Sequence, residues 1–281
     1  MSRLRRDRRA VFGIAVLSFV AGAGVAAPLI STGAPAAQHE VVATRFQPPL
    51  STDRAGTFHL LGTDRFGRDV WTRLVYGARI SIAVGGVAVL LSLVIGLVVG
   101  AAAGYWPGVP RVVLLGVTDF TIAVPRVVLI LLLAALTRPS AGLVILVVGL
   151  TGWMSVARLV QGEVRALTAR PFVEGALALG LSQRRVLARH IAPNALTPVI
   201  VSAALGLGQA ITLEASLSFL GLGVQPPTPS WGNMIASGRD TLVNAPWVAT
   251  APGIALALVV VACTLLGDAL QDALNPTARY G

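Results

Sequence analysis

The sequence has no lysine, one cysteine, three histidines and few charged residues of any kind. Its charged fraction, 12% of 281 residues, lies well below the roughly 25% that soluble domains carry. Because Cys263 is alone, an internal disulfide and a thiolate metal site are excluded. His39, His59 and His190 lack the spacing of metal ligands. No phosphate-binding GxxxxGKS or GxxxxGKT loop occurs, so we expect no metal, nucleotide or other cofactor on this chain.

Apolar residues dominate instead, at 55% of the chain and with a mean hydropathy of +0.77. A membrane-spanning helix needs about 20 largely apolar residues. Six such runs predict an all-α integral membrane fold, at about 10–30, 80–104, 112–136, 140–160, 195–215 and 248–267. The net charge of +10 comes from arginines that flank these runs, and this arrangement argues against a nucleic-acid partner.

The arginine distribution predicts the orientation in the bilayer. Five arginines precede the first run, and cytoplasmic flanks are the basic ones, so both termini are expected in the cytoplasm. A cleaved signal peptide is the alternative for the first run, although about 20 apolar residues favour a retained anchor. The expected organisation is an N-terminus with the first span (1–30), an extracytoplasmic loop (31–79), a five-helix core (80–276) and a short tail (277–281).

Ionisable residues within apolar runs each require a reason, because burying them in lipid costs on the order of 2.5–3.5 kcal/mol. Asp119 and Arg126 lie seven residues apart in the third run, and Glu214 lies near the outer end of the fifth. On one helix, a spacing of seven places two residues on the same face. These three residues are candidates for a polar translocation path. Pairing between helices is the alternative reading.

A basic stretch, "RPFVEGALALGLSQRRVLARHIAPN", interrupts the apolar runs between Arg170 and Asn194. Pro171 suits the first turn of a helix, and Gly180 suits the position just after a helix end. Pro193 is expected to close a second short helix, with Asn194 as the cap of the fifth span. The stretch, within the predicted cytoplasmic segment 161–193, therefore reads as a helix–glycine–helix elbow or, more simply, as a solvated basic loop.

The elbow resembles the EAA motif of ABC-importer permeases. Glu174, Gly175 and Ala176 match EAA with one substitution, Gly180 follows after four residues, and Pro193 after thirteen more. Further stretches resemble the dipeptide/oligopeptide/nickel branch of that family, in its C-type subunit. These are "HLLGTDRFGRDVWTRLVYGARIS", "ASLSFLGLGVQPPTPSWGNMI", "GRDTLVNAPWVATAPG" and "LLGDALQDALNP", and the resemblance covers about residues 56–276.

This resemblance implies a type I importer permease with a cytoplasmic coupling helix, located in the bacterial plasma membrane. Its implied partners are a second, B-type permease, two ATPase subunits that hold ATP and Mg²⁺, an extracytoplasmic solute-binding protein and the lipid bilayer. The residues that would couple to the ATPase are Glu174, Gly175, Ala176, Leu177, Gly180 and Pro193. The implied cargo is a di- or oligopeptide, with nickel chelates or haem as alternatives. A secondary transporter or a membrane enzyme would leave the elbow unexplained.

The loop 31–79 departs from the orientation rule, because it is expected outside the cell and yet is rich in arginine. Its last part, "GTDRFGRDVWTRLVYGARIS" from Gly62, has an amphipathic pattern. Val70, Trp71 and Leu74 are expected to face the membrane, and Arg68, Asp69 and Arg73 are expected to face water or protein. One interpretation is an interfacial anchor for the second span. The other is a docking surface for the solute-binding protein, formed by part of this loop together with the loop 224–247, in which Arg45, Arg54 and Arg65 pair with acids on that partner.

Overall fold

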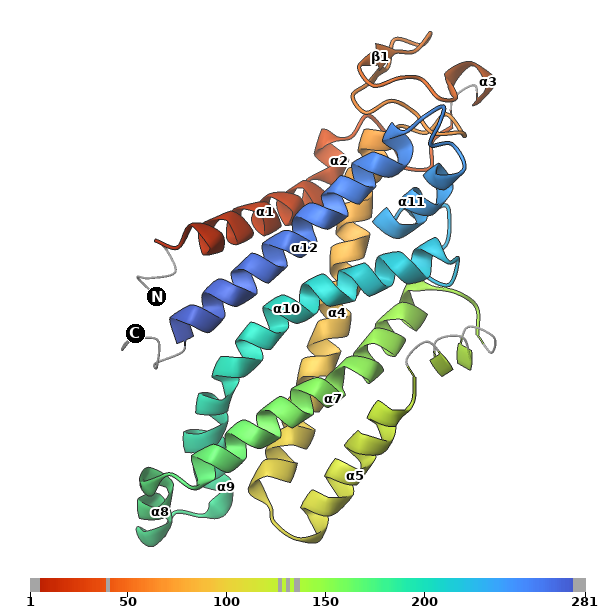
Figure 1. The fold of residues 1–281 in the computed structure, drawn as a ribbon. Coiled ribbons are helices and arrows are strands. Elements are labelled where there is room, and N and C mark those ends of the chain that lie inside the picture. The colour runs from red at the N-terminus through yellow and green to blue at the C-terminus, as the bar shows by residue number, and fades with distance from the viewer. Residues whose placement is uncertain (1–5, 39–40, 126–127, 130–131, 134–136, 275–281) are drawn as a thin grey trace.

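The computed structural model describes residues 6–38, 41–125, 128–129, 132–133 and 137–274. Long helices make up an elongated bundle (Figure 1), namely α1 (Arg8–Val25), α4 (Val70–Tyr105), α7 (Ala141–Thr168), α10 (Ala192–Phe219) and α12 (Trp247–Leu274). The shorter helices are α2 (Ala27–Ile30), α3 (Val41–Thr44), α5 (Val109–Ala123), α8 (Pro171–Ala178), α9 (Gln183–Val186) and α11 (Trp231–Arg239), and a π-helical turn, η1 (Leu187–Ile191), leads into α10. One antiparallel hairpin, β1 (Ser51–Thr52) with β2 (Phe58–His59), accompanies them.

Within the described residues, five helices are long and apolar enough to cross a membrane: 8–25, 70–105, 141–168, 187–219 and 247–274. They correspond to five of the six predicted spans. The remaining one, predicted at 112–136, corresponds to α5 and to residues that partly lie outside the described ones. α5 ends at Ala123, and Val124 is extended. The following residue is Pro125, and a proline disfavours the helical conformation in the residue before it.

One boundary, the start of α4, differs from the sequence prediction in a way that matters for the loop 31–79. The segment from Val70 is not a separate interfacial element, because it forms the first turns of α4, which Asp69 caps by accepting a hydrogen bond from the Thr72 N–H. Val70 is 1% exposed and Leu74 packs against the same core. Both side chains therefore face the protein interior, not the membrane as expected.

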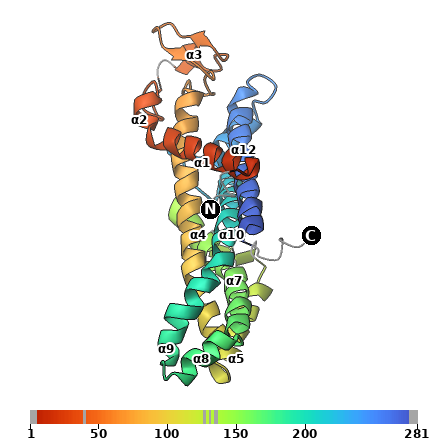
Figure 2. The same cartoon turned by 90° about the vertical axis from the view of Figure 1, so that its left-hand side faces the viewer.

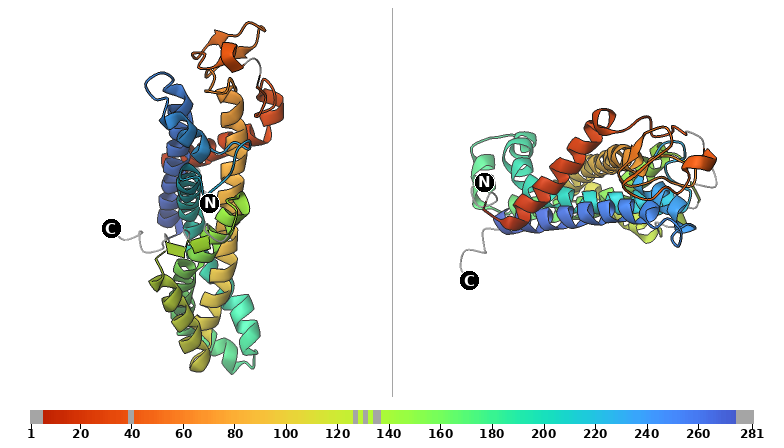
Figure 3. Two further views of the ribbon diagram at one scale, coloured as in Figure 1. Left: turned by 90° about the vertical axis from the view of Figure 1, so that its right-hand side faces the viewer. Right: turned by 90° about the horizontal axis from the view of Figure 1, so that it is seen from above.

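The hairpin and the α8–α9 elbow lie at opposite ends of the molecule, and the long axis of α4 connects these ends (Figures 1 and 2). At the hairpin end, α11 and the first turns of α4 and α12 share a core around Trp231, Met234 and Val248. α1 packs beside α12, as the view from above also shows (Figure 3). A Cβ on Gly13 would lie only 2.7 Å from the Ala262 carbonyl oxygen, so the absence of a side chain permits this contact.

A stripe of glycines on α4 allows α7 to approach this helix closely. Gly96, Gly100 and Gly104 recur every four residues and therefore share one face. A Cβ on Gly100 would lie 2.5 Å from the Ala157 carbonyl oxygen, and one on Gly104 would lie 2.8 Å from Val164 Cβ, both on α7. Small residues allow this approach in a membrane, where van der Waals packing holds helices together. The missing side chains of Gly96, Gly100 and Gly104 thus permit the contact between α4 and α7.

A matched pair of substitutions on α4 tests this contact. Gly100→Ala should lower the thermal unfolding midpoint of the purified protein, because the added methyl group forces α4 and α7 apart. Gly86→Ala should not, since nothing lies within 4 Å of a Cβ at Gly86 and alanine gains roughly 1 kcal/mol of helix propensity over glycine. Equal midpoints for the two variants would show that the stripe does not limit helix packing.

Candidate functional site

The elbow between α7 and α10 consists of α8, α9 and η1. α8 begins at Pro171, as predicted, and ends shortly before Gly180, whose φ of +82° is left-handed. The Leu181 N–H donates to the Ala176 carbonyl oxygen at 3.2 Å, which is a bond of the glycine-terminated helix cap. The prediction that Gly180 ends the first helix of the elbow is therefore confirmed.

The two faces of α8 have different surroundings. Val173 is 2% exposed and Ala176 is 9% exposed, and both pack into a cluster of aliphatic side chains from α7, α9, η1 and α10, which contains Val156, Val160, Val164, Val186, Ile191, Ala195 and Val199. Glu174 and Gly175 lie on the outer face, and no atom lies within 4 Å of a Cβ at Gly175. The side chain of Leu177 is outside the described residues. α8 is thus fixed to the bundle on one face and open on the other.

Two capping predictions in the elbow are wrong. Pro193 does not close a helix, because it lies in the first turn of α10, which continues directly from η1. Proline has no N–H to donate, and the π-helical turn accommodates it: the Ala192 N–H donates to Leu187, five residues back. Asn194 is no cap either, since its side-chain amide donates to the His190 carbonyl oxygen at 2.6 Å.

Buried charges organise the opposite end of the molecule. Arg68 Nη2 lies 2.7 Å from Asp64 Oδ2, and Arg73 Nε lies 3.8 Å from the same oxygen. All three side chains are less than 10% exposed. Arg73 also donates to the Pro35 carbonyl oxygen at 3.1 Å. Two of the arginines that opposed the orientation rule are therefore paired inside the loop.

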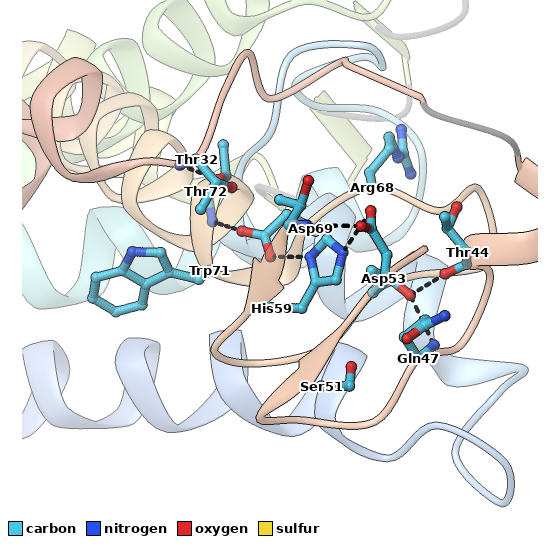
Figure 4. Close-up of polar contacts among 12 residues, drawn as sticks. Thr32, Thr44, Gln47, Ser51, Asp53, His59, Arg68, Asp69, Trp71 and Thr72 are labelled. Atoms are coloured by element: carbon cyan, nitrogen blue, oxygen red, sulfur yellow. Dashed lines mark hydrogen bonds and ion pairs between the residues drawn. The ribbon is translucent and has the colours of Figure 1, made fainter. Parts of the chain in front are cut away.

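A second polar contact, shown in Figure 4, fixes the hairpin to α4. His59 Nδ1 lies 2.9 Å from Asp69 Oδ1, and His59 Nε2 lies 3.5 Å from Asp53 Oδ2. The Thr57 backbone N–H donates to Asp53 at 2.8 Å and holds the pKa of that carboxyl below its usual value, so Asp53 is ionised at neutral pH. Because Asp69 also caps α4, the hairpin and the helix start are held as one unit.

Arg45, Arg54 and Arg65, the predicted docking residues, are all exposed on this unit. Within the described part of the chain, none of them has an ion-pair partner; Arg65 stacks on the Phe66 ring, 4.7 Å from its centroid. The described acids of residues 41–69, which are Asp53, Asp64 and Asp69, take part in the contacts above. Three guanidinium groups therefore remain available on this outer surface.

A cavity of about 830 Å³ lies between α4, α7, α10 and α12. Most of its walls come from one face of α7, between Val148 and Leu167, and from one face of α10, between Asn194 and Leu213. Residues of α4 and the last turn of α12 complete it. α7 runs toward α8 and α10 runs away from it, so the cavity extends along the bundle and ends near the elbow.

Glu214, one of the predicted path residues, is fully buried and does not line this cavity. Its carboxylate accepts hydrogen bonds from Ser81 at 2.8 Å and Ser218 at 2.7 Å. The Ser81 hydroxyl in turn accepts a hydrogen bond from the backbone N–H of Trp231. In this structure Glu214 therefore connects α10 with α4 and the start of α11.

Asp119 does not line the cavity either, and it forms an ion pair with Arg158 of α7. The side chains of this pair are about half exposed. Arg126 lies outside the described residues. The prediction that Asp119 and Arg126 share one helix face therefore falls outside the described residues.

Several polar residues that do line the cavity are not among the candidates predicted from the sequence. Ser155 and Glu163 project from α7, and Thr197, Ser202 and Gln209 project from α10. A recognisable signal was their spacing, since single polar residues recur on one face of otherwise apolar spans. No group of three or more His, Cys, Asp or Glu side chains among the described residues could hold a metal ion.

Comparison with known proteins agrees with this architecture. Residues 77–280 match the family described as binding-protein-dependent transport system inner membrane component. A Brucella abortus relative, named provisionally as a peptide transport system permease protein, is 39% identical over 277 residues, which cover 99% of this chain and 90% of that relative. The dipeptide transport system permease protein DppC of Alkalihalophilus pseudofirmus is 35% identical over 277 residues, covering 99% and 88%.

Among solved structures, one of the inward-facing MetNI methionine ABC transporter has a chain that is similar in fold. The TM-score is 0.57 at 21% sequence identity, and the alignment covers 72% of this chain and 96% of that chain. At this identity the likeness concerns the fold alone.

Removing the shared carboxylate of the outer unit tests the role of its buried charges. Asp64→Ala leaves Arg68 and Arg73 buried without their partner, a change that typically costs about 3–5 kcal/mol. We expect a large fall in the thermal unfolding midpoint and rapid proteolysis of residues 31–69. Asp240→Ala is the control, because its pair with Arg239 is more than 60% exposed and contributes little. A midpoint for Asp64→Ala like that of the control would contradict this role.

Proposed function

Because the chain belongs to the family of binding-protein-dependent transport system inner membrane components, we propose that it forms half of the membrane path of an ATP-driven importer for di- or oligopeptides. The chain is a multi-pass membrane permease subunit and not an enzyme. The relatives named for peptide and dipeptide transport, similar over 99% of this chain, support the choice of cargo. A second, B-type permease would complete the path within the lipid bilayer.

One observation carries the proposal: the elbow is joined to α7 and α10, the two helices that make most of the cavity walls. Val173 and Ala176 of α8 belong to the same buried cluster as Val160 and Val164 of α7, and Asn194 and Thr197 of α10 follow η1 directly. A force on the outer face of α8 would therefore move both cavity walls. Packed elements of this kind move as rigid bodies between discrete states.

Two ATPase subunits, which would hold ATP and Mg²⁺, are the proposed source of that force. The elbow presents Glu174 and Gly175 outward, beside the exposed apolar side chains of Phe172 and Leu179. A small helix face with one carboxylate suits a cleft that contains an arginine. The proposed coupling residues are Glu174, Gly175, Ala176, Leu177, Gly180 and Pro193, with Ala176 acting from the buried side and Pro193 from the first turn of α10.

The opposite end is the proposed contact for a solute-binding protein, which would deliver the peptide. Arg45, Arg54 and Arg65 are exposed there without acidic partners in the described chain. The elbow would then lie in the cytoplasm, together with both termini, and the hairpin would lie outside the plasma membrane. The proposed units are the first span with its N-terminus (1–30), the outer loop (31–79), the five-helix core (80–276) and the tail.

Coupling is tested by two substitutions in the elbow. Glu174→Lys reverses the outward charge, and Gly180→Val places a β-branched residue at a φ of +82°, which is strained for such a side chain. Both should leave the protein inserted in proteoliposomes and yet abolish uptake and substrate-stimulated ATP hydrolysis. Asp268→Lys, a charge reversal at another exposed site, is the control. Normal coupling in both elbow variants would contradict the assignment of the elbow as the contact with the ATPase.

The docking surface is tested by replacing Arg45, Arg54 and Arg65 together with Gln. Binding-protein affinity for the purified transporter should fall by about tenfold or more, since exposed pairs contribute up to about 1 kcal/mol each. Affinity should also fall with added salt, because the Debye length is about 8 Å at physiological ionic strength. Basal ATP hydrolysis should not change. Arg138→Gln, at an exposed arginine between α5 and α7, is the control, and wild-type affinity in the triple variant would contradict the proposal.

A further inference from the structure

Two helices, α7 and α10, contribute polar side chains to the cavity, and the charged one comes from α7. α7 contributes Ser155 and Glu163, and α10 contributes Thr197, Ser202 and Gln209. Because the two helices run in opposite directions, Glu163, five residues before the end of α7, lies at the same end of the cavity as Thr197, in the second turn of α10. That end adjoins the elbow. Gln209 lies toward the other end.

These polar side chains retain unused hydrogen-bonding capacity. In the same bundle, Thr212 and Thr264 donate to the carbonyl oxygens four residues earlier in their helices, as hydroxyls in apolar helices commonly do. Within the described part of the chain, Ser155, Thr197, Ser202 and Gln209 make no such bond or any other side-chain hydrogen bond. Their donors and acceptors are therefore open to whatever enters the cavity.

Glu163 is the charged residue of the cavity lining, and the other lining residues are apolar or neutral and polar. No ion pair or hydrogen bond within the described residues involves its carboxylate. A carboxylate in a partly apolar site attracts a cation more strongly than one in bulk water. The cavity thus has a negative pole at the elbow end and neutral hydrogen-bonding groups along its length.

We propose that this cavity binds a peptide in transit and that Glu163 receives its N-terminal ammonium group. This inference rests on the proposed function and goes beyond it, since it assigns a site and a direction to the cargo. Thr197 and Gln209 are twelve residues apart on α10, or about 18 Å at 1.5 Å per residue. That length matches about five residues of extended chain. The free hydroxyl and amide groups face the peptide bonds, which are the same in every sequence.

The arrangement explains how one site can accept peptides of many sequences. Contacts to the ammonium group and to the backbone carry no side-chain information, whereas apolar lining residues such as Leu159 and Leu205 accept varied side chains. The amino end therefore leads toward the elbow. A cargo without an ammonium group loses its one charge-assisted contact, which is the stronger kind of hydrogen bond.

The test uses the complete transporter in nanodiscs without ATP and a reporter cysteine, Ser202→Cys, in a Cys263→Ala background. Alkylation of the reporter by N-ethylmaleimide is read on the band of this chain. Two probes compete with it: trialanine amide, which has a free ammonium group, and its N-acetylated form, which is neutral. Their half-protecting concentrations are compared in chains with Glu163 and with Glu163→Gln.

With Glu163 present, trialanine amide should protect at a concentration about tenfold lower than the acetylated probe, the ratio expected for one charge-assisted hydrogen bond. Glu163→Gln should reduce this ratio to about one, and Glu163→Asp should retain part of it. Asp240→Asn removes an exposed carboxylate outside the cavity and should keep the full ratio. Size-exclusion profiles of the variants verify that each transporter is intact.

Equal protection by both probes with Glu163 present would overturn the inference, as would an undiminished ratio in Glu163→Gln or no protection by either probe. Uptake of a labelled tripeptide by the same preparation, with its binding protein and ATP, separates this failure from that of the proposed function. Uptake without selective protection overturns the ammonium site alone. No uptake of any peptide by a transporter with active ATPase overturns both.

Discussion

The contact between α4 and α7 brings the bare backbone of Gly96, Gly100 and Gly104 against backbone carbonyl oxygens and valine side chains of α7, because the glycines have no side chain of their own. Inside lipid no hydrophobic effect favours one helix partner over another, so dispersion contacts of this density decide which helices pair. With α7 fixed to α4, a neighbouring face of α7 forms a wall of the cavity. The elbow then has a firm support in Val160 and Val164.

The charges of the chain fall into two groups with different consequences. Buried groups such as Asp64, Arg68 and Arg73 pair with one another and hold the outer unit together. Glu214 has a similar structural place, with hydroxyl groups as its partners. Groups without partners in the described chain, such as Arg54, Glu163 and Glu174, lie on surfaces or in the cavity, where a partner or a cargo can reach them.

Much of the architecture could be predicted from the sequence, because spans and orientation depend on local composition. The apolar runs gave five spans that agree with the long helices to within about ten residues, and Pro171 and Gly180 marked the first helix of the elbow correctly. The start of α4 was misplaced. Its first turns looked amphipathic, and only packing against α11 and α12 shows that Val70 is interior.

The sequence by itself determined that this is a membrane permease with an elbow of defined spacing, since hydropathy, arginine flanks and motif order are properties of the linear chain. Only the tertiary structure decided which polar residues could meet a cargo. In the sequence, Glu214 lies within an apolar run, whereas Glu163 lies just after one, at the start of the segment predicted to be cytoplasmic. One is enclosed by Ser81 and Ser218 and the other opens into the cavity, because the exposure of a side chain depends on which helices pack beside it.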